Sequence, residues 1–152
     1  MIFRFLLLLS FICSLSCGSK KSALPSDTPE RPKISFTFDD GITTDMPGYP
    51  FQVWNAMLLQ NLEKEGVQAI FFVTGSNKTD EKGRFLLNSW NDAGHSIGNH
   101  TFSHPGYNSD KISFEDFKQE FLKTDTIIRQ YSNYVKLFRF PYLKEGNTAE
   151  KI

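Results

Sequence analysis

The chain has 152 residues, of which 39% are hydrophobic and 14% aromatic, and it contains two cysteines. This composition indicates one ordinary globular domain and excludes both a disordered chain and a disulfide-held scaffold. Lys and Arg number 17, as do Asp and Glu, so the net charge is zero. The charges form no basic runs, which excludes the electrostatic footprint of a nucleic-acid-binding protein.

The first residues, 1–16, have the layout of a secretory signal peptide: Arg4 is the only charge and residues 5–12 are almost wholly apolar. The apolar run is too short to span a membrane, which takes about 20 residues. Cys17 follows and resembles the lipid-attachment site of bacterial lipoproteins, although Ser14 stands where that family usually has Leu. We expect an exported protein with Cys17 acylated and anchored in the cell envelope; plain secretion and an uncleaved anchor are the alternatives.

Residues 17–32 are rich in Ser, Lys and Pro and are expected to be a flexible linker before a domain at 33–152. In that domain short apolar runs alternate with longer segments of helical spacing. The pattern predicts a strand at 34–38, a helix from Trp54 towards a stop at Gly66, and a strand at 69–73. A helix at 85–93 and a strand at 96–99 follow. The last predicted elements are a helix capped by Ser113 and Asp116, with Phe114, Phe117, Phe121 and Ile128 on one face, and a strand at 137–140.

This alternation predicts an α/β fold with a parallel sheet covered by helices. Functional residues are expected at the carboxyl ends of the strands, because ligands of such sheets bind there. Polar motifs follow three of the predicted strands.

Asp39 and Asp40 come at the end of the first predicted strand, 34–38, and precede Gly41, whose conformational freedom would let both carboxylates turn into one site. Adjacent acids at a strand end suggest a metal site. For the pair taken alone, helix capping and solvation explain the residues equally well.

His100 and His104 follow the third strand, four residues apart, so that both imidazoles can reach one ion. Two histidines and one aspartate leave coordination positions open on zinc or a similar ion, as catalysis requires. A purely structural role for the histidine pair is the alternative.

Arg139 lies at the end of the fourth predicted strand, beside a turn fixed by Pro141. A guanidinium there can hold a carboxylate in place, and the turn can aim a backbone N–H at a developing oxyanion. An ordinary surface arginine is the alternative.

Three segments of the chain, TFDDG at 37–41, HTFSHP at 100–105 and RFPY at 139–142, resemble the first three motifs of the polysaccharide deacetylases, carbohydrate esterase family 4, in the same order. The segments 66–73 and 94–99 are also similar to that family, and the resemblance extends over residues 33–144.

The resemblance implies a distorted (β/α) barrel in which Asp40, His100 and His104 bind a divalent metal, zinc or else cobalt or another ion. It implies that Asp39 is the general base for the attacking water. It also implies that Arg139 orients Asp39 and that the Tyr142 backbone N–H stabilises the oxyanion. We expect His95 to have a structural role, by packing or hydrogen bonding behind the site.

The sequence departs from the family pattern at Leu143, where a glycine is common, and at residues 43–50, an extended first loop. The family's later motifs, which include the general-acid histidine, are absent from these 152 residues. We therefore expect a barrel truncated after about four strands, with an open sheet edge and little deacetylase activity on its own.

The favoured function is metal-dependent hydrolysis of N- or O-linked acetyl groups on a polysaccharide such as peptidoglycan, a chitin-like glycan or xylan. A catalytically inactive glycan-binding lipoprotein, or truncated remnant, is one alternative. A different metal hydrolase, such as a phosphoesterase, is another, because Asp and His ligands serve both chemistries.

Overall fold

Four parallel strands and three α-helices alternate along the part of the chain that the computed structural model describes, residues 33–149 and 151. The elements are β1 (Phe36–Asp40), α1 (Phe51–Lys64), β2 (Ala69–Val73), α2 (Glu81–Asp92), β3 (Ser96–Asn99), α3 (Phe114–Ile128), β4 (Tyr134–Phe138) and a short 3-10 helix, η1 (Pro141–Leu143). The predicted signal peptide and Cys17 lie outside the described residues. Within those residues no helix is long and apolar enough to cross a membrane.

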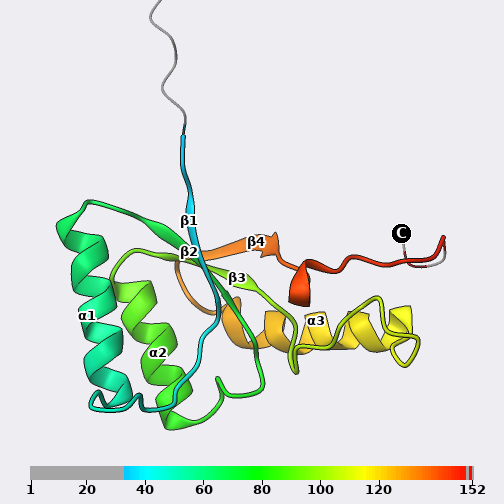
Figure 1. Ribbon diagram of the computed structural model, residues 1–152, viewed down its shortest axis with the longest axis horizontal. Coiled ribbons are helices and arrows are strands. Elements are labelled where there is room, and N and C mark those ends of the chain that lie inside the picture. Colours follow the sequence, from blue (N-terminus) through cyan, green and yellow to red (C-terminus); the bar gives the residue numbers. More distant parts are fainter. Residues whose placement is uncertain (1–32, 150, 152) are drawn as a thin grey trace, which may run out of the picture. The chain divides into compact units, whose positions relative to one another are not determined.

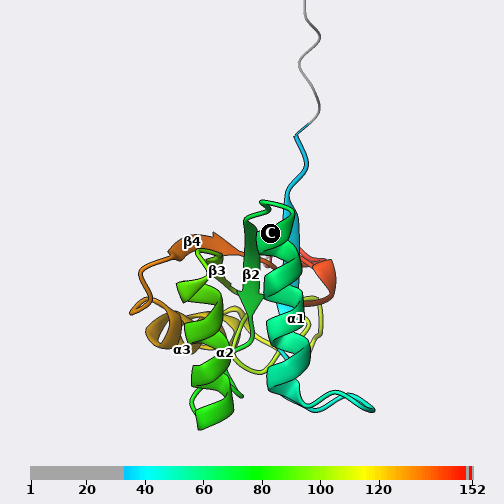
Figure 2. The same cartoon turned by 90° about the vertical axis from the view of Figure 1, so that its left-hand side faces the viewer.

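The strands form one sheet in the order β1-β2-β3-β4, with every neighbouring pair parallel. Sequential parallel strands joined by crossovers of one hand place all the connecting helices on the same face of the sheet. Figures 1 and 2 show this arrangement, with α1 and α2 alongside each other and α3 running across their direction, all on one side of the strands. The predicted α/β class is confirmed, and the sheet has the strand order of a partial (β/α) barrel.

The core lies between the sheet and the helices. Phe71 on β2 stacks on Trp90 of α2 with ring centroids 4.2 Å apart, and Phe38 on β1 meets the same indole edge-on at 5.3 Å. Because strand side chains alternate between faces, the intervening residues Asp39 and Phe72 lie on the opposite face, away from the helices. Asp39, the candidate base on β1, therefore stands on the face that would line a barrel.

Strands β2 and β3 have the predicted bounds, whereas two other strands are displaced. β1 lies two residues beyond its predicted position, because the strand ladder continues through Asp39 and Asp40, which pair with Phe72 and Val73. β4 spans Tyr134–Phe138 instead of 137–140 and is paired with β3 through an irregular register.

Helix boundaries differ from prediction for local reasons. Helix α2 begins at Glu81, four residues early, because the Asp80 carboxylate accepts the Gly83 N–H and caps a first turn that has no apolar residues. The capping box of Ser113 and Asp116 is confirmed at the start of α3. Phe114, predicted on the apolar face of that helix, is instead 62% exposed in its first turn.

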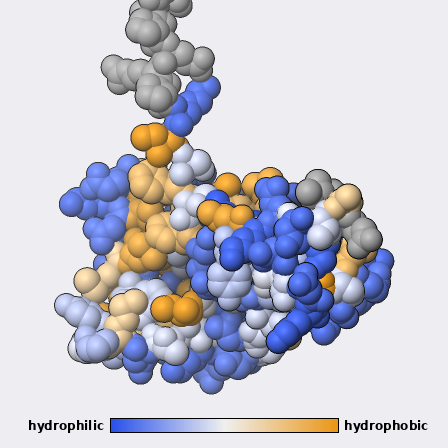
Figure 3. Space-filling model, turned by 45° about the vertical axis from the view of Figure 1, so that its right-hand side comes forward, coloured by the Kyte–Doolittle hydropathy of each residue, from blue (hydrophilic) through white to orange (hydrophobic). Residues whose placement is uncertain are grey.

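Within the described residues β1 and β4 are the sheet edges, since each pairs on one side only. Ile34 and Phe36 are 79% and 49% exposed along the β1 edge. Figure 3 shows a band of hydrophobic surface on this side of the molecule. The predicted open edge with exposed apolar side chains is thus present in this part of the chain.

Candidate active site

The turn after β1 directs two adjacent carboxylates to different places. Asp40 and Gly41 both have left-handed backbone conformations, with φ of 66° and 74°, and the Gly41 N–H donates to the Asp39 carbonyl at 2.8 Å. A Cβ at Gly41 would come within 2.6 Å of the Phe71 ring, so only glycine fits. The tight turn thus places Asp40, the last residue of β1, at the carboxyl end of the sheet.

The turn after β3 brings in the two predicted histidines. Asn99 braces it, since its side-chain oxygen accepts the Thr101 N–H at 2.9 Å and its amide donates to the Phe121 carbonyl of α3 at 2.9 Å. His100 is 2% exposed, while the His104 side chain is 26% exposed. One imidazole is therefore fixed inside the fold and the other borders the solvent.

Asp40, His100 and His104 form a compact cluster whose ligand atoms lie within 4.8 Å of one another. Asp40 Oδ1 is 3.7 Å from His100 Nε2 and 3.3 Å from His104 Nε2. Ligands of a tetrahedral zinc at about 2.0–2.1 Å would be about 3.3–3.4 Å apart, so the cluster matches the donor set and spacing of such a site. The structure brings together all three residues predicted as metal ligands.

The second ring nitrogen of His100 is already committed. Its Nδ1 lies 2.8 Å from the Arg139 carbonyl oxygen and donates to it in the neutral tautomer that leaves Nε2 free. Burial lowers the pKa of His100, although the bond to the Arg139 carbonyl and the nearby Asp39 carboxylate oppose the shift. A neutral imidazole oriented by a carbonyl is the form in which histidine binds metals.

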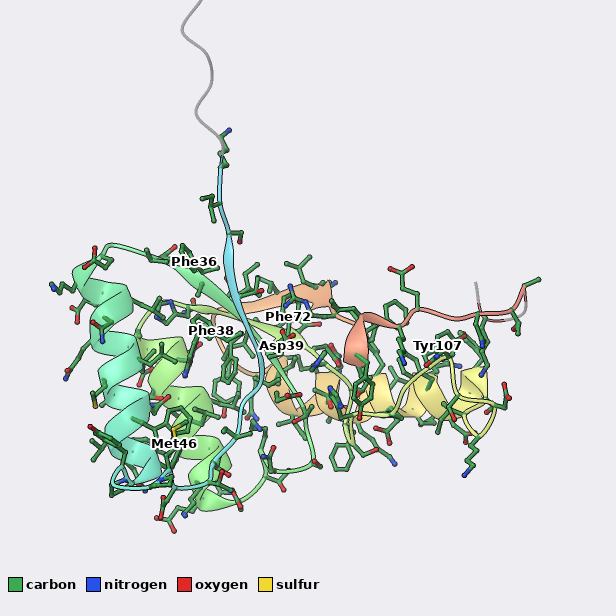
Figure 4. All side chains as sticks on the ribbon, viewed as in Figure 1. Phe36, Phe38, Asp39, Met46, Phe72 and Tyr107 are labelled. Carbon is green, nitrogen blue, oxygen red and sulfur yellow. The ribbon has the colours of Figure 1, made fainter. Side chains whose placement is uncertain are left out.

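Arg139 joins the ends of β4 and β1. Its Nη1 donates to Asp39 Oδ1 at 2.8 Å and to Thr37 Oγ1 at 2.9 Å, and its guanidinium lies over the Phe72 ring at 4.4 Å from the centroid. Figure 4 shows Asp39 and Phe72 side by side on the neighbouring strands. Three contacts to two strands hold the guanidinium, which in turn fixes one Asp39 oxygen.

Tyr142 occupies the turn after Arg139 with a φ of 58° inside η1. Its ring meets that of His104 edge-on, with centroids 4.5 Å apart, so the Tyr142 side chain borders the cluster. Among the hydrogen bonds of the described residues none uses the Tyr142 N–H, whereas the following N–H groups of Leu143 and Lys144 are bonded. This donor is available to a ligand.

Backbone strain is concentrated at the site. Non-glycine residues with positive φ in the described chain all belong to the three motif-bearing turns: Asp40, Thr101, His104, Tyr142 and Leu143. Left-handed conformations cost roughly 1–2 kcal/mol per residue. Such clustering is typical of functional sites.

His95 lies at the amino end of β3, away from the cluster at the carboxyl end. It is 3% exposed, and its Nδ1 accepts the Ala69 N–H at 3.3 Å. Burial lowers its pKa. A cavity of about 590 Å³ beside His95 is lined by residues of α1, α2 and their loops, and none of the cluster residues lines it. His95 has the packing and hydrogen-bonding role expected, but at the opposite end of the strand from the site.

Four residues near the site were not predicted from the sequence. Thr37 and Phe72 hold the Arg139 guanidinium. The sequence could have indicated this role, because the alternation of side chains along the two strands places both residues on the same face of the sheet as Asp39. Thr74 and Lys78, from the loop after β2, hold the turn at Asp40 and Gly41. Nothing in the sequence marks Lys78, which resembles an ordinary surface lysine.

The fold and the cluster together define a class: a parallel α/β protein with a two-histidine, one-aspartate site of the kind that binds a catalytic metal, next to an arginine-held carboxylate. The model of the polysaccharide deacetylase family matches residues 26–152. The chain belongs to that family.

Among curated relatives, a peptidoglycan-N-acetylglucosamine deacetylase of Bacillus cereus is 32% identical over 113 residues, or 74% of this chain and 37% of its own length. A chitin deacetylase of Colletotrichum lindemuthianum is 30% identical over 114 residues, or 72% of this chain and 42% of its own length. The chain thus spans about two fifths of the length of these relatives.

Solved structures of deacetylases share the fold of this chain. The peptidoglycan deacetylase PdaC from Bacillus subtilis superimposes with a TM-score of 0.58 at 29% identity, covering 76% of this chain and 51% of that one. The Colletotrichum lindemuthianum chitin deacetylase has a TM-score of 0.58 at 27% identity, covering 72% and 46%. The fold of the described residues is that of part of a family 4 carbohydrate esterase domain.

Proposed function

We propose that this chain supplies the metal-binding and water-activating part of a deacetylase that removes acetyl groups from an amino-sugar polysaccharide. The observation that carries the proposal is the cluster of Asp40, His100 and His104 beside the pair of Asp39 and Arg139. The relatives are named as deacetylases of peptidoglycan N-acetylglucosamine and of chitin. Their names favour N-acetyl groups as the substrate of this chain over the O-acetyl groups of a polymer such as xylan.

Asp40, His100 and His104 would hold the metal, zinc or another divalent ion such as cobalt. When bound, such an ion polarises the acetyl carbonyl and makes water a better nucleophile at neutral pH. The donor set of one carboxylate and two neutral imidazoles suits zinc and leaves positions open for water and substrate.

Asp39 takes the proton as the water oxygen forms its bond to the acetyl carbon. Arg139 keeps the second Asp39 oxygen free for this task by holding Oδ1 at 2.8 Å. As the π bond of the carbonyl breaks and its oxygen becomes an oxyanion, the Tyr142 N–H donates a hydrogen bond to that oxygen. Collapse of this adduct releases acetate and expels the amine or alcohol, which must receive a proton.

That last proton needs a donor. The chain has three histidines, of which two belong to the cluster and His95 lies at the far end of β3. No histidine among the described residues is therefore left for the leaving group. An amine leaves poorly without a proton, so its release from these residues alone should be slower by about 10²–10⁴-fold.

The absence of this proton donor from the described residues can be tested with a substrate whose leaving group needs no proton. The phenolate of 4-nitrophenyl acetate leaves without a proton, so this ester requires only the base, the metal ligands and the oxyanion donor. We expect the full chain with added zinc or cobalt to hydrolyse the ester and to release acetate from N-acetylglucosamine oligomers far more slowly.

Asp39→Asn and His100→Ala should each abolish the metal-dependent rate, while His95→Gln, at the other end of β3, serves as the matched histidine control. A rate that survives Asp39→Asn unchanged would contradict the proposed chemistry. Binding of glycan oligomers without hydrolysis of either substrate would favour the inactive glycan-binding protein. Hydrolysis of 4-nitrophenyl phosphate, but not of the acetate, would favour a phosphoesterase.

We also propose that the protein is exported and anchored at the cell envelope through Cys17. The support is the signal-like composition of residues 1–16 and the small residues before the cysteine. A polysaccharide of the cell envelope would then be within reach of the site.

A further inference from the structure

Lys78 is buried in the loop after β2, with 1% of its surface exposed. Lysine is almost never fully buried unless its ammonium is paired. The catalytic steps proposed above assign it no part. Its position directly beneath the turn at Asp40 suggests a reason for its burial.

The Lys78 ammonium is aimed at the backbone of that turn. Its Nζ donates to the Gly41 carbonyl at 2.6 Å and also to the Asn77 side-chain oxygen. Its aliphatic part packs so closely that a Cβ at Gly41 would lie 2.9 Å from Lys78 Cε. The end of the lysine side chain therefore packs directly against Gly41.

The loop after β2 donates hydrogen bonds to the backbone carbonyls of both left-handed residues, Asp40 and Gly41. Thr74 donates its N–H and its hydroxyl to the Asp40 carbonyl at 3.1 and 3.0 Å, and Lys78 donates to the next carbonyl, that of Gly41. Positive φ at Asp40 is costly for a residue with a Cβ, and it persists only when surrounding contacts impose it. These three bonds are such contacts.

The charge of Lys78 strengthens the contact. Burial lowers the pKa of Lys78 to about 8, while the carboxylates of Asp40 and Asp80 oppose the shift. At neutral pH the amine is therefore still protonated, and its bond to the Gly41 carbonyl is charge-assisted, roughly twice as strong as a neutral one.

We propose that Lys78 is a positioning residue of the metal site: its buried ammonium holds the Gly41 carbonyl and so fixes the turn that directs the Asp40 carboxylate at the two imidazoles. The inference rests on the proposed metal site. It adds that the geometry of this site depends on a side chain that touches none of its ligand atoms.

The test measures cobalt binding by the full chain, because Co²⁺ reports its coordination through its visible absorption spectrum. Lys78→Met keeps the aliphatic stem but removes the donors, and Lys78→Arg keeps a charged donor. Groups that orient metal ligands typically contribute 10–100-fold to affinity. We expect Lys78→Met to raise the Co²⁺ dissociation constant by about this factor and to change the visible bands, with Lys78→Arg closer to wild type.

The matched control is Lys82→Met, which replaces an exposed lysine in the first turn of α2 and should bind as wild type does. Far-UV circular dichroism and thermal unfolding accompany each measurement. Wild-type affinity and spectrum in a folded Lys78→Met variant would overturn the inference, even if its melting temperature fell. If Lys78→Met does not fold, Lys78→Gln replaces it, and loss of folding in both would assign Lys78 to the core instead. Failure of the wild-type chain to bind Co²⁺ at all would refute the proposed metal site itself.

Discussion

Arg139 can be changed in a way that separates the position of the base from the binding of the metal. Its side chain holds Asp39, while its main-chain carbonyl holds His100 Nδ1 at 2.8 Å. Arg139→Lys removes the planar fork but keeps the charge and the carbonyl. A lysine ammonium cannot reproduce the guanidinium contacts to Asp39, Thr37 and the Phe72 ring together.

The contacts set the expected magnitudes. The side chains of Arg139 and Asp39 are 26% and 38% exposed, so the ion pair contributes only about 0–1 kcal/mol to stability, and the contact with Phe72 about 0.5–1 kcal/mol. The free energy of unfolding should therefore fall by about 0.5–2 kcal/mol. The effect on rate should be larger, because a shift of about 1 Å in a reacting group costs about 10²-fold.

The assay compares three quantities in wild type and Arg139→Lys: the rate of 4-nitrophenyl acetate hydrolysis with saturating Co²⁺, the Co²⁺ dissociation constant and the free energy of unfolding in urea. We expect a rate lower by about 10–100-fold with a dissociation constant within about threefold of wild type. Arg129→Lys, at the exposed end of α3, is the control. An unchanged rate, or a loss of cobalt binding as large as the loss of rate, would refute the reasoning.

Three further predictions concern stability, pH and export. Leu143→Gly should raise the free energy of unfolding by about 0.5–1 kcal/mol in thermal and urea unfolding, because Leu143 has a φ of 55° and is 76% exposed; a decrease would contradict the strain. The pKa of Lys78 is about 8 in the folded protein, against an ordinary lysine value of 10.5, so between these pH values the unfolded chain binds more protons than the folded one. The free energy of unfolding of the metal-free wild type should therefore rise, relative to that of Lys78→Met, by up to about 3 kcal/mol as the pH increases from 8 to 10.5. Urea titrations at both ends of this range check it, and parallel curves for the two proteins would exclude it. Labelled palmitate should be incorporated into the wild-type chain and not into Cys17→Ser; labelling of both would rule out Cys17 as the acylated residue.

The sequence predicted most of the fold and the residues of the site because both depend on strong local patterns. β2 is a buried apolar run with sharp ends, and the motifs after β1, β3 and β4 meet because parallel strands end at one edge of the sheet. β1 was misplaced by two residues because its last two positions are carboxylates, which strands rarely contain, and only pairing with β2 keeps them in the ladder.

What the sequence did not predict depends on three-dimensional contacts. Phe114 fits the apolar spacing of α3 but lies in its first turn, where little packs against it. The roles of Thr74 and Lys78 could not be predicted, because neither residue type indicates that it will be buried under a turn 34 or 37 residues earlier in the chain. The Arg139 contact with Phe72 likewise depends on the alternation of faces across three strands.

The left-handed residues around the site link the metal to the folding equilibrium. Five non-glycine residues at roughly 1–2 kcal/mol each amount to about 5–10 kcal/mol, which is comparable to the whole stability of a typical domain. An ion that binds only the folded arrangement adds RT ln(1 + [ion]/Kd) to that stability, about 2.7 kcal/mol at a hundred times Kd. The concentration of a free divalent ion that fits this cluster would then control the amount of folded protein as well as the occupancy of the site.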